Sequence, residues 1–291
     1  MEYIVSILLS GISVGGQYAL IAIGYTMVYG ILRLINFAHG DVFMVAGLLG
    51  IYLTATMPLY LSLPLVLILT VALGFAIERL AYKPLRTAPR MSVMISAIGV
   101  SYLLQNLVSY ITGGLSKQFP DIPLISESVK FLGVKDKLTV FISPVVAVIL
   151  MVVLVLIIDH TKFGMSMRAV SRDFETSQLM GVKINRVISI TFGIGAFLAA
   201  VGSILYFAKN SGINHLAGST PGIKAFIAAV VGGIGSIPGA VVGALIIGVV
   251  ESLAKAFGLA DFSDVISFAL LIIILVVKPT GLFGETTTEK V

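Results

Sequence analysis

The sequence contains no cysteine, so it can form neither a disulfide nor a thiol-based site. Charge is also scarce, because 11% of the 291 residues are charged, against roughly a quarter in soluble domains. The chain also lacks a phosphate-binding P-loop, a nucleophile elbow and a His-Glu-x-x-His zinc motif. A catalytic role is therefore not indicated, and energy for any transport has to come from another chain or from an ion gradient.

Apolar residues make up 58% of the chain and the mean hydropathy is +1.07, as is typical of a polytopic membrane protein. A membrane-spanning helix needs about 20 mostly apolar residues. We therefore predict an all-α integral membrane protein with about eight spanning helices, in which residues 1–291 form a single transmembrane domain. The predicted spans are residues 3–28, 35–56, 61–80, 93–111, 140–158, 188–208, 224–253 and 262–277.

The seventh predicted span is too long for one simple helix and is interrupted by glycines and a proline. The interrupting residues are Gly232, Gly233, Gly235, Pro238 and Gly239. Broken backbone inside a membrane survives only where protein or a water-filled cavity surrounds it. We predict a short or re-entrant helix, a tight turn near residues 232–239, and a full span from Ala240. A simple kink is the alternative.

The arginines predict the orientation of the chain. All seven fall in three alternate segments between spans: Arg33, Arg79, Arg86, Arg90, Arg168, Arg172 and Arg186. The positive-inside rule places these segments in the cytoplasm. The N-terminus and the loop 113–139, which has four lysines and no arginine, are then external. The net charge of +5 is expected to meet anionic membrane lipid rather than nucleic acid.

The predicted cytoplasmic loop 159–187 carries charged residues between two long apolar spans. Arg168 and Arg172 are four residues apart, so they share one face of a helix and could pair with acidic groups of a partner. The run 176–181 places Thr176 and Ser177 ahead of Gly181. Small residues followed by a glycine can form a short helix and a turn that fit a cleft on a soluble partner. A plain solvated connector is the alternative.

Polar side chains line one face of two predicted spans. At 100° per residue, Gln17 shares a stripe of the first span with several serines, and Ser101 and Gln105 share a stripe of the fourth. Buried polar groups in membranes are costly and usually have a purpose. These three residues are therefore candidates for a translocation pathway, with hydrogen bonding between helices as the alternative.

The densest polar cluster near a span contains Asn36, His39 and Asp41. It could form a proton relay, a metal site or a helix cap. One histidine and one carboxylate are too few for a structural metal site, which wants about four ligands, so we predict no metal. Asn36 and His39 are further pathway candidates, and capping of a helix by Asn36 or Asp41 is the alternative.

Several stretches of the sequence resemble the LivH-type permease of bacterial branched-chain amino-acid ABC importers, and the similarity covers essentially the whole chain. The stretches are residues 17–30, 35–41, 78–86, 95–99 and 230–240. The resemblance implies a type II importer fold with a pore between two permeases. It also implies a coupling helix in the long cytoplasmic loop, whose small-small-x-x-x-Gly core falls on Thr176, Ser177 and Gly181. Family members often have Ala-Ala at the first two of these positions.

The resemblance further implies partners that one chain does not reveal. They are a second related permease, two cytoplasmic ATP-binding subunits and an extracytoplasmic substrate-binding protein. ATP is then bound by the partners, this chain needs no cofactor, and the location is the bacterial inner membrane. Related permeases carry other neutral amino acids, amides or urea, so the substrate stays open.

The alternative function is a self-sufficient secondary transporter or channel. That class predicts inverted repeats and charge inside the membrane. The sequence shows no clear repeat and no unpaired carboxylate in the middle of a predicted span.

Overall fold

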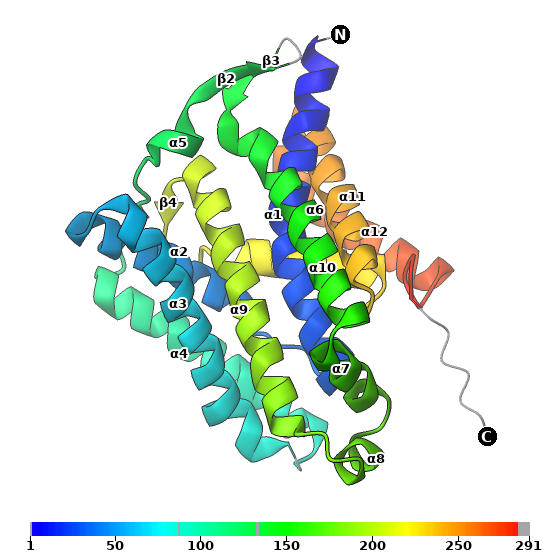
Figure 1. Ribbon diagram of the computed structural model, residues 1–291. Coiled ribbons are helices and arrows are strands. Elements are labelled where there is room, and N and C mark those ends of the chain that lie inside the picture. Colours follow the sequence, from blue (N-terminus) through cyan, green and yellow to red (C-terminus); the bar gives the residue numbers. More distant parts are fainter. Residues whose placement is uncertain (1, 87, 132–133, 285–291) are drawn as a thin grey trace.

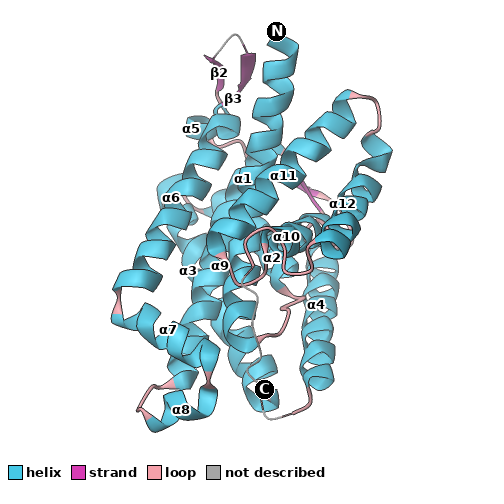
Figure 2. Ribbon diagram, turned by 90° about the vertical axis from the view of Figure 1, so that its right-hand side faces the viewer, coloured by secondary structure: helices cyan, strands magenta, loops and turns pink. Residues whose placement is uncertain are grey.

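The computed structural model describes residues 2–86, 88–131 and 134–284 and is almost entirely helical (Figure 2). The long helices are α1 (Glu2–Leu32), α2 (His39–Thr56), α3 (Leu59–Ile77), α4 (Arg90–Thr112), α6 (Leu138–His160), α9 (Ile184–Lys209) and α11 (Ile237–Ala256). The shorter ones are α5 (Pro123–Ser126), α7 (Lys162–Arg172), α8 (Phe174–Leu179), α10 (Ser219–Gly232) and α12 (Ser263–Val277). A π-helical turn η1 (Glu78–Tyr82) and the 3-10 turns η2 (Lys83–Leu85) and η3 (Ala260–Phe262) extend the helices beside them.

Eight helical stretches of the described residues are long and apolar enough to cross a membrane. The predicted fold class is therefore confirmed. Strands occur as two short antiparallel pairs: β1 (Lys117–Gln118) with β4 (Gly212–Ile213), and β2 (Ser128–Phe131) with β3 (Val134–Lys137).

Helix α1 packs against α6, α9, α10 and α11 and is held closest to α11. A Cβ atom on Gly11 would lie 2.8 Å from the Cα atom of Val249, and one on Gly15 would lie 2.8 Å from the Cα atom of Leu245. From the other side, Gly248 lies against the backbones of both glycines. Small residues let two membrane helices approach this closely, and the pairing shows that α1 and α11 are antiparallel.

The interruption in the seventh predicted span consists of helix α10, a turn at residues 233–236 and helix α11. Helix α11 begins at Ile237, three residues before the predicted start. Helix α10 has 14 residues, which gives a length of about 21 Å and is too short for an apolar core of about 30 Å. Figure 1 shows α10 lying across the bundle rather than along it.

The five interrupting residues act in different ways. Gly233 and Gly235 have φ angles of 107° and 104°, which the turn requires and which residues with a Cβ atom rarely adopt. Gly232 and Gly239 lie backbone to backbone, where a Cβ atom has no room. Pro238 was wrongly grouped with the helix breakers, because it lies in the first turn of α11, where a missing N–H costs nothing.

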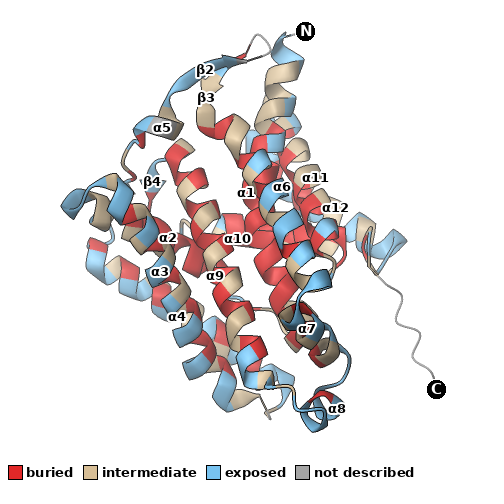
Figure 3. Ribbon diagram, viewed as in Figure 1, coloured by how far each residue is buried: buried red, intermediate tan, exposed pale blue. Residues whose placement is uncertain are grey.

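The two ends of the bundle differ in charge. The segments with all seven arginines lie at the end that carries α7 and α8, which we call the arginine end (Figure 1). The opposite end carries the start of α1 and the pair β2–β3, and we call it the hairpin end. Buried residues concentrate in α1, α9, α10 and α11, whereas α4, α6 and α12 expose much of their apolar surface (Figure 3).

Candidate functional site

At the arginine end, α6 turns sharply into α7. The Thr161 hydroxyl accepts a hydrogen bond from the Gly164 N–H at 3.1 Å and so caps α7. Gly164 is required here, because a Cβ atom would collide with the backbone of Ile158. The loop 159–187 therefore contains ordered helices.

Helix α8 is capped by Asp173. Its carboxylate accepts hydrogen bonds from the backbone N–H groups of Glu175, at 2.9 Å, and Thr176, at 3.1 Å, and from the Thr176 hydroxyl, at 2.6 Å. These bonds favour the ionised form, and the bond from the Thr176 hydroxyl contributes most to lowering the pKa of the Asp173 carboxyl below its ordinary value. The small residue at position 176 is thus part of the cap.

Ser177 points toward this chain's own backbone. It is buried, and its hydroxyl donates to the Asp173 carbonyl at 2.6 Å. The most exposed large apolar residues of this segment are Leu179 and Met180, with 87% and 80% of their surface accessible. Gly181 follows with a φ angle of 83° and reverses the chain toward α9. This apolar pair was not among the predicted coupling residues, because the prediction rested on the small residues Thr176 and Ser177 and on Gly181.

The two arginines predicted to meet a partner have different surroundings. Arg168 donates to the Ile158 carbonyl and lies 3.4 Å from the Asp159 carboxylate, so it fastens α7 to the end of α6. Arg172 is exposed in the last turn of α7. Both side chains are exposed, and Arg168 is the one with a hydrogen bond and an ion pair to the end of α6.

The polar stripe of α4 meets the carboxylate of Asp41 in α2. The Ser101 hydroxyl donates to Asp41 Oδ2 at 2.5 Å, and Gln105 Nε2 donates to Oδ1 at 3.0 Å. Asp41 is 3% exposed, and none of the ion pairs in the described part of the chain includes it. The sequence predicted no unpaired carboxylate in the middle of a span, because Asp41 lies near the start of the predicted span 35–56 and was assigned to the polar cluster with Asn36 and His39.

Asn36 and His39 border a small hollow between α1, α2, α3 and α9. Asn36 Oδ1 accepts from the hydroxyl of Tyr82, at 2.8 Å, and from the N–H of Ala38, at 3.2 Å. The His39 ring is buried against Gly24, and its Nε2 atom has no hydrogen-bond partner among the described residues. The hollow has room for about one water molecule.

Gln17 lies in a closed contact between helices. It is fully buried, and its Nε2 atom donates to the Ser143 hydroxyl at 3.2 Å and to the Leu205 carbonyl at 3.4 Å. It therefore joins α1 to α6 and α9. Its position fits the hydrogen-bonding alternative better than a pathway lining.

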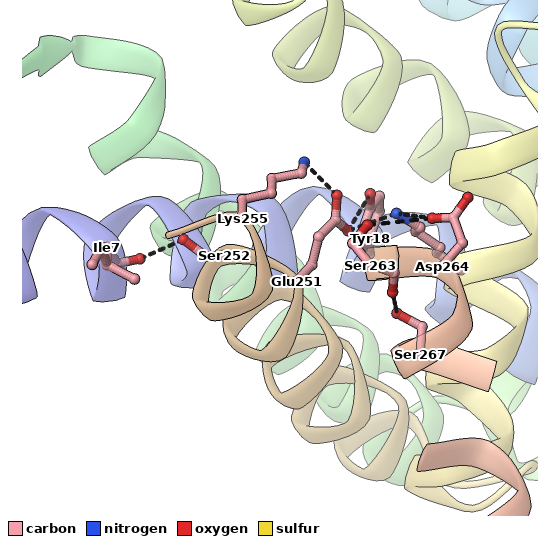
Figure 4. A network of polar contacts seen from close by, with 9 residues as sticks. Ile7, Tyr18, Glu251, Ser252, Lys255, Ser263, Asp264 and Ser267 are labelled. Carbon is pink, nitrogen blue, oxygen red and sulfur yellow. Dashed lines mark hydrogen bonds and ion pairs between the residues drawn. The ribbon is translucent and has the colours of Figure 1, made fainter. Parts of the chain in front are cut away.

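A buried ion network beside α10 was not anticipated (Figure 4). Lys224 Nζ lies 3.0 Å from a carboxylate oxygen of Glu251 and 2.8 Å from one of Asp264. Glu251 also accepts from Lys255, at 2.6 Å, and from the Tyr18 hydroxyl, at 2.9 Å. A lysine inside an apolar run is a sequence signal for a buried ion pair, but in the prediction Lys224 was only the first residue of the span 224–253.

The second ion pair near a span lies at the arginine end. Glu78 in η1 is buried and pairs with Arg86, and it also accepts from the Ser189 hydroxyl at 2.6 Å. Arg86 in turn donates to Asn185 at the start of α9. Among the described residues no three histidine, cysteine or acidic side chains are grouped closely enough to hold a metal ion.

Comparisons with known proteins identify the family. Residues 7–275 match the model described as "Branched-chain amino acid transport system / permease component". The chain belongs to this family. The permease protein LivH of Salmonella typhimurium is 41% identical over 99% of this chain and 98% of its own length. The permease protein BraD of Pseudomonas aeruginosa is 43% identical over 98% and 97%, and LivH of Escherichia coli K12 is 39% identical over 99% and 98%.

Membership of the branched-chain amino-acid permease family makes the chain a membrane permease component of an ABC transport system. This agrees with the helices suited to spanning a membrane. The polar clusters described above then belong to a transport protein rather than to an enzyme active site.

Proposed function

We propose that this chain is the permease of an ATP-driven importer that moves branched-chain amino acids into the bacterial cytoplasm. The proposal is supported by relatives of 39–43% identity that are named as permeases of high-affinity branched-chain amino-acid transport systems. These relatives match along nearly their whole length, so the same elements are available for the same task.

The observation that carries the coupling proposal is the tip of the loop 159–187. Leu179 and Met180 project from a capped helix and expose most of their apolar surface. Exposed apolar side chains on an otherwise polar, ordered segment are typical of a protein contact. We assign this tip to contact with an ATP-binding subunit on the cytoplasmic side, with ATP bound by that subunit and no cofactor bound by this chain.

The pathway is proposed to lie between this chain and a second permease. The hollow beside His39 and a second one, lined by Tyr25, Tyr29 and Phe226, each have room for about one water molecule. Neither accommodates a free amino acid. A second permease, a pair of ATP-binding subunits and an extracytoplasmic binding protein complete the proposed importer in the bacterial inner membrane.

The orientation follows from charge. All seven arginines lie at the arginine end, so the positive-inside rule favours a cytoplasmic arginine end and an external hairpin end. The tip of α8 then faces the compartment that contains ATP.

One observation favours a secondary transporter as the competing function. Asp41 is a buried carboxylate held by neutral donors, and an ionisable group inside a membrane is a typical site of ion coupling. The two functions differ in their source of energy, so that source is what an experiment has to measure.

The test compares this chain alone with the complete complex in liposomes. With the partners and internal ATP, we expect uptake of labelled leucine that stops without ATP. With this chain alone, an imposed proton or sodium gradient should drive none. Uphill uptake by the chain alone, lost in Asp41→Asn, would refute the importer and establish the secondary transporter.

A further inference from the structure

Helix α10 lies inside the bundle but does not cross it. At about 21 Å it runs from the start of α2, where Gly218 and Gly222 lie against Gly40, to the turn before α11. Its Phe226 ring packs 6.0 Å from the Tyr25 ring of α1. Tyr25 lies seven residues, or about 10 Å, from the end of that helix. A short helix that ends this far from the ends of the spanning helices requires protein or water around its terminal backbone groups.

One face of α10 is not covered by this chain. The exposed or half-buried positions are spaced by one, three or four residues: Ser219, Thr220, Ile223, Phe226 and Val230. Ile223 is 48% exposed, whereas Ala225, on the opposite side of the helix, is fully buried. Phe226 also borders the hollow between α1 and α10. The rotation of α10 about its own axis therefore decides which side chains are presented.

The ion network opposes a change in that rotation. The Lys224 ammonium lies 3.0 Å from Glu251 on α11 and 2.8 Å from Asp264 on α12, and both Lys224 and Glu251 are buried (Figure 4). At a side-chain radius of about 6 Å, a rotation of about 30° would carry the ammonium roughly 3 Å. Both contacts would then break, and a buried cation would lose both of its counter-charges.

The far end of α10 is held by the chain that follows α12. The N–H groups of Leu282 and Phe283 donate to the carbonyls of Val231 and Gly232, each at 2.9 Å. These bonds satisfy carbonyls that a helix end otherwise leaves open. Helix α12 and the chain that follows it thus hold α10 at two points, and the contact at Lys224 is made by a side chain of α10.

We propose that Lys224 is a positioning residue of the transport pathway. Clamped between Glu251 and Asp264, it sets the rotation of α10 and so presents Ile223 and Phe226 to the aliphatic side chain of the transported amino acid. The inference rests on the proposed function for the identity of the cargo. The link between the ion network and the rotation of α10 does not depend on it.

The absence of cysteine allows the rotation to be read directly. Ile223→Cys and Ala225→Cys are made separately in the assembled complex and treated with a charged, membrane-impermeant methanethiosulfonate. We expect Cys at position 223 to react and to be protected by leucine, and Cys at 225 to be inert. An inert Cys at 223 would show that this face meets lipid or another subunit, and would overturn the proposal.

A second experiment distinguishes an effect of Lys224 on the rotation of α10 from an effect on the stability of the fold. Removing both members of a buried ion pair is often neutral for folding, whereas removing one is destabilising. Lys224→Met with Glu251→Gln should therefore keep the melting temperature of the complex. It should lower leucine uptake at least tenfold and raise labelling at 225 at least tenfold relative to labelling at 223. Ser252→Ala, which removes only a hydrogen bond to Ile7 beside the network, should change uptake less than twofold.

Failure of the Lys224 proposal and failure of the proposed function give different results. If the double variant transports leucine at the parental rate with an unchanged labelling pattern, the network is structural and the proposal is wrong. If the parental complex does not transport branched-chain amino acids, the proposed function has failed. The labelling ratio then still decides whether Lys224 sets the rotation of α10.

Discussion

The docking role of the α8 tip can be tested by shortening Leu179 and Met180 to serine. The two side chains are 87% and 80% exposed, so they contribute little to the fold of this chain. If docking buries them, each contributes about 1.5–3 kcal/mol. Losing both should weaken the contact by roughly 3–6 kcal/mol. Since about 1.4 kcal/mol is tenfold in affinity, docking should weaken by at least a hundredfold.

The assay is substrate-stimulated ATP hydrolysis in the reconstituted complex, together with co-purification of the ATP-binding subunits. The double variant should lose both, while the melting temperature of the isolated permease stays within one or two degrees. Gln178→Ala is the matched control, because Gln178 is an exposed neighbour on the same helix without a large apolar surface. Parental ATPase activity and co-purification in the double variant would show that the tip is not the contact.

Three further predictions follow from the geometry. Gly232→Ala should destabilise the permease by roughly 1–3 kcal/mol because its Cβ would meet the Gly239 carbonyl. Gly99→Ala should not destabilise it, because nothing lies within 4 Å of a Cβ atom there. Equal melting temperatures of the two variants would contradict this prediction. A cysteine at Ser171 should react with an impermeant reagent only from the cytoplasm and one at Ser126 only from outside, and reversed labelling would refute the orientation. The folded-state pKa of Asp173 is lowered, so its contribution to capping α8 is present above the ordinary pKa of about 3.9 and is lost as the pH falls through the lower, folded-state value. Amide hydrogen exchange in α8 should therefore become faster as the pH falls through that lower value. Unchanged exchange would contradict the cap.

The spans were predictable because bilayer thickness and helix rise together fix the length of an apolar run. The interruption near residues 232–239 was predictable because Gly232, Gly233 and Gly235 lie within four residues, and glycine at that density disfavours a continuous helix. What local sequence does not contain is the neighbour that each residue meets. Gly235 and Gly239 look alike in sequence, yet one supplies a positive φ angle and the other a close backbone contact.

The same limit explains the errors at the polar residues. A motif of small residues drew attention to Ser177, but which face of a six-residue helix turns inward depends on the cap that starts it, here Asp173. Lys224 and Asp264 are 40 residues apart in the chain, so no local periodicity could place their charges together. Asp41 is bonded by Ser101 and Gln105 of α4, which lie 60 and 64 residues further along the chain, so its buried position is not visible in the local sequence.

A series of packed helices connects the α8 tip at the arginine end with α10. At the arginine end, α8 is joined to α9 through Gly181, and α7 packs on α1, α6 and α9. Helix α1 is in turn locked to α11 through Gly11, Gly15 and Gly248, and α11 carries the carboxylate that holds Lys224 of α10. These steps combine helix packing, close backbone contacts between glycines and an ion pair between two buried side chains. Packed elements of this kind shift between discrete arrangements instead of deforming gradually, so we expect a displacement of α7 and α8 to reach α10 through α1 and α11.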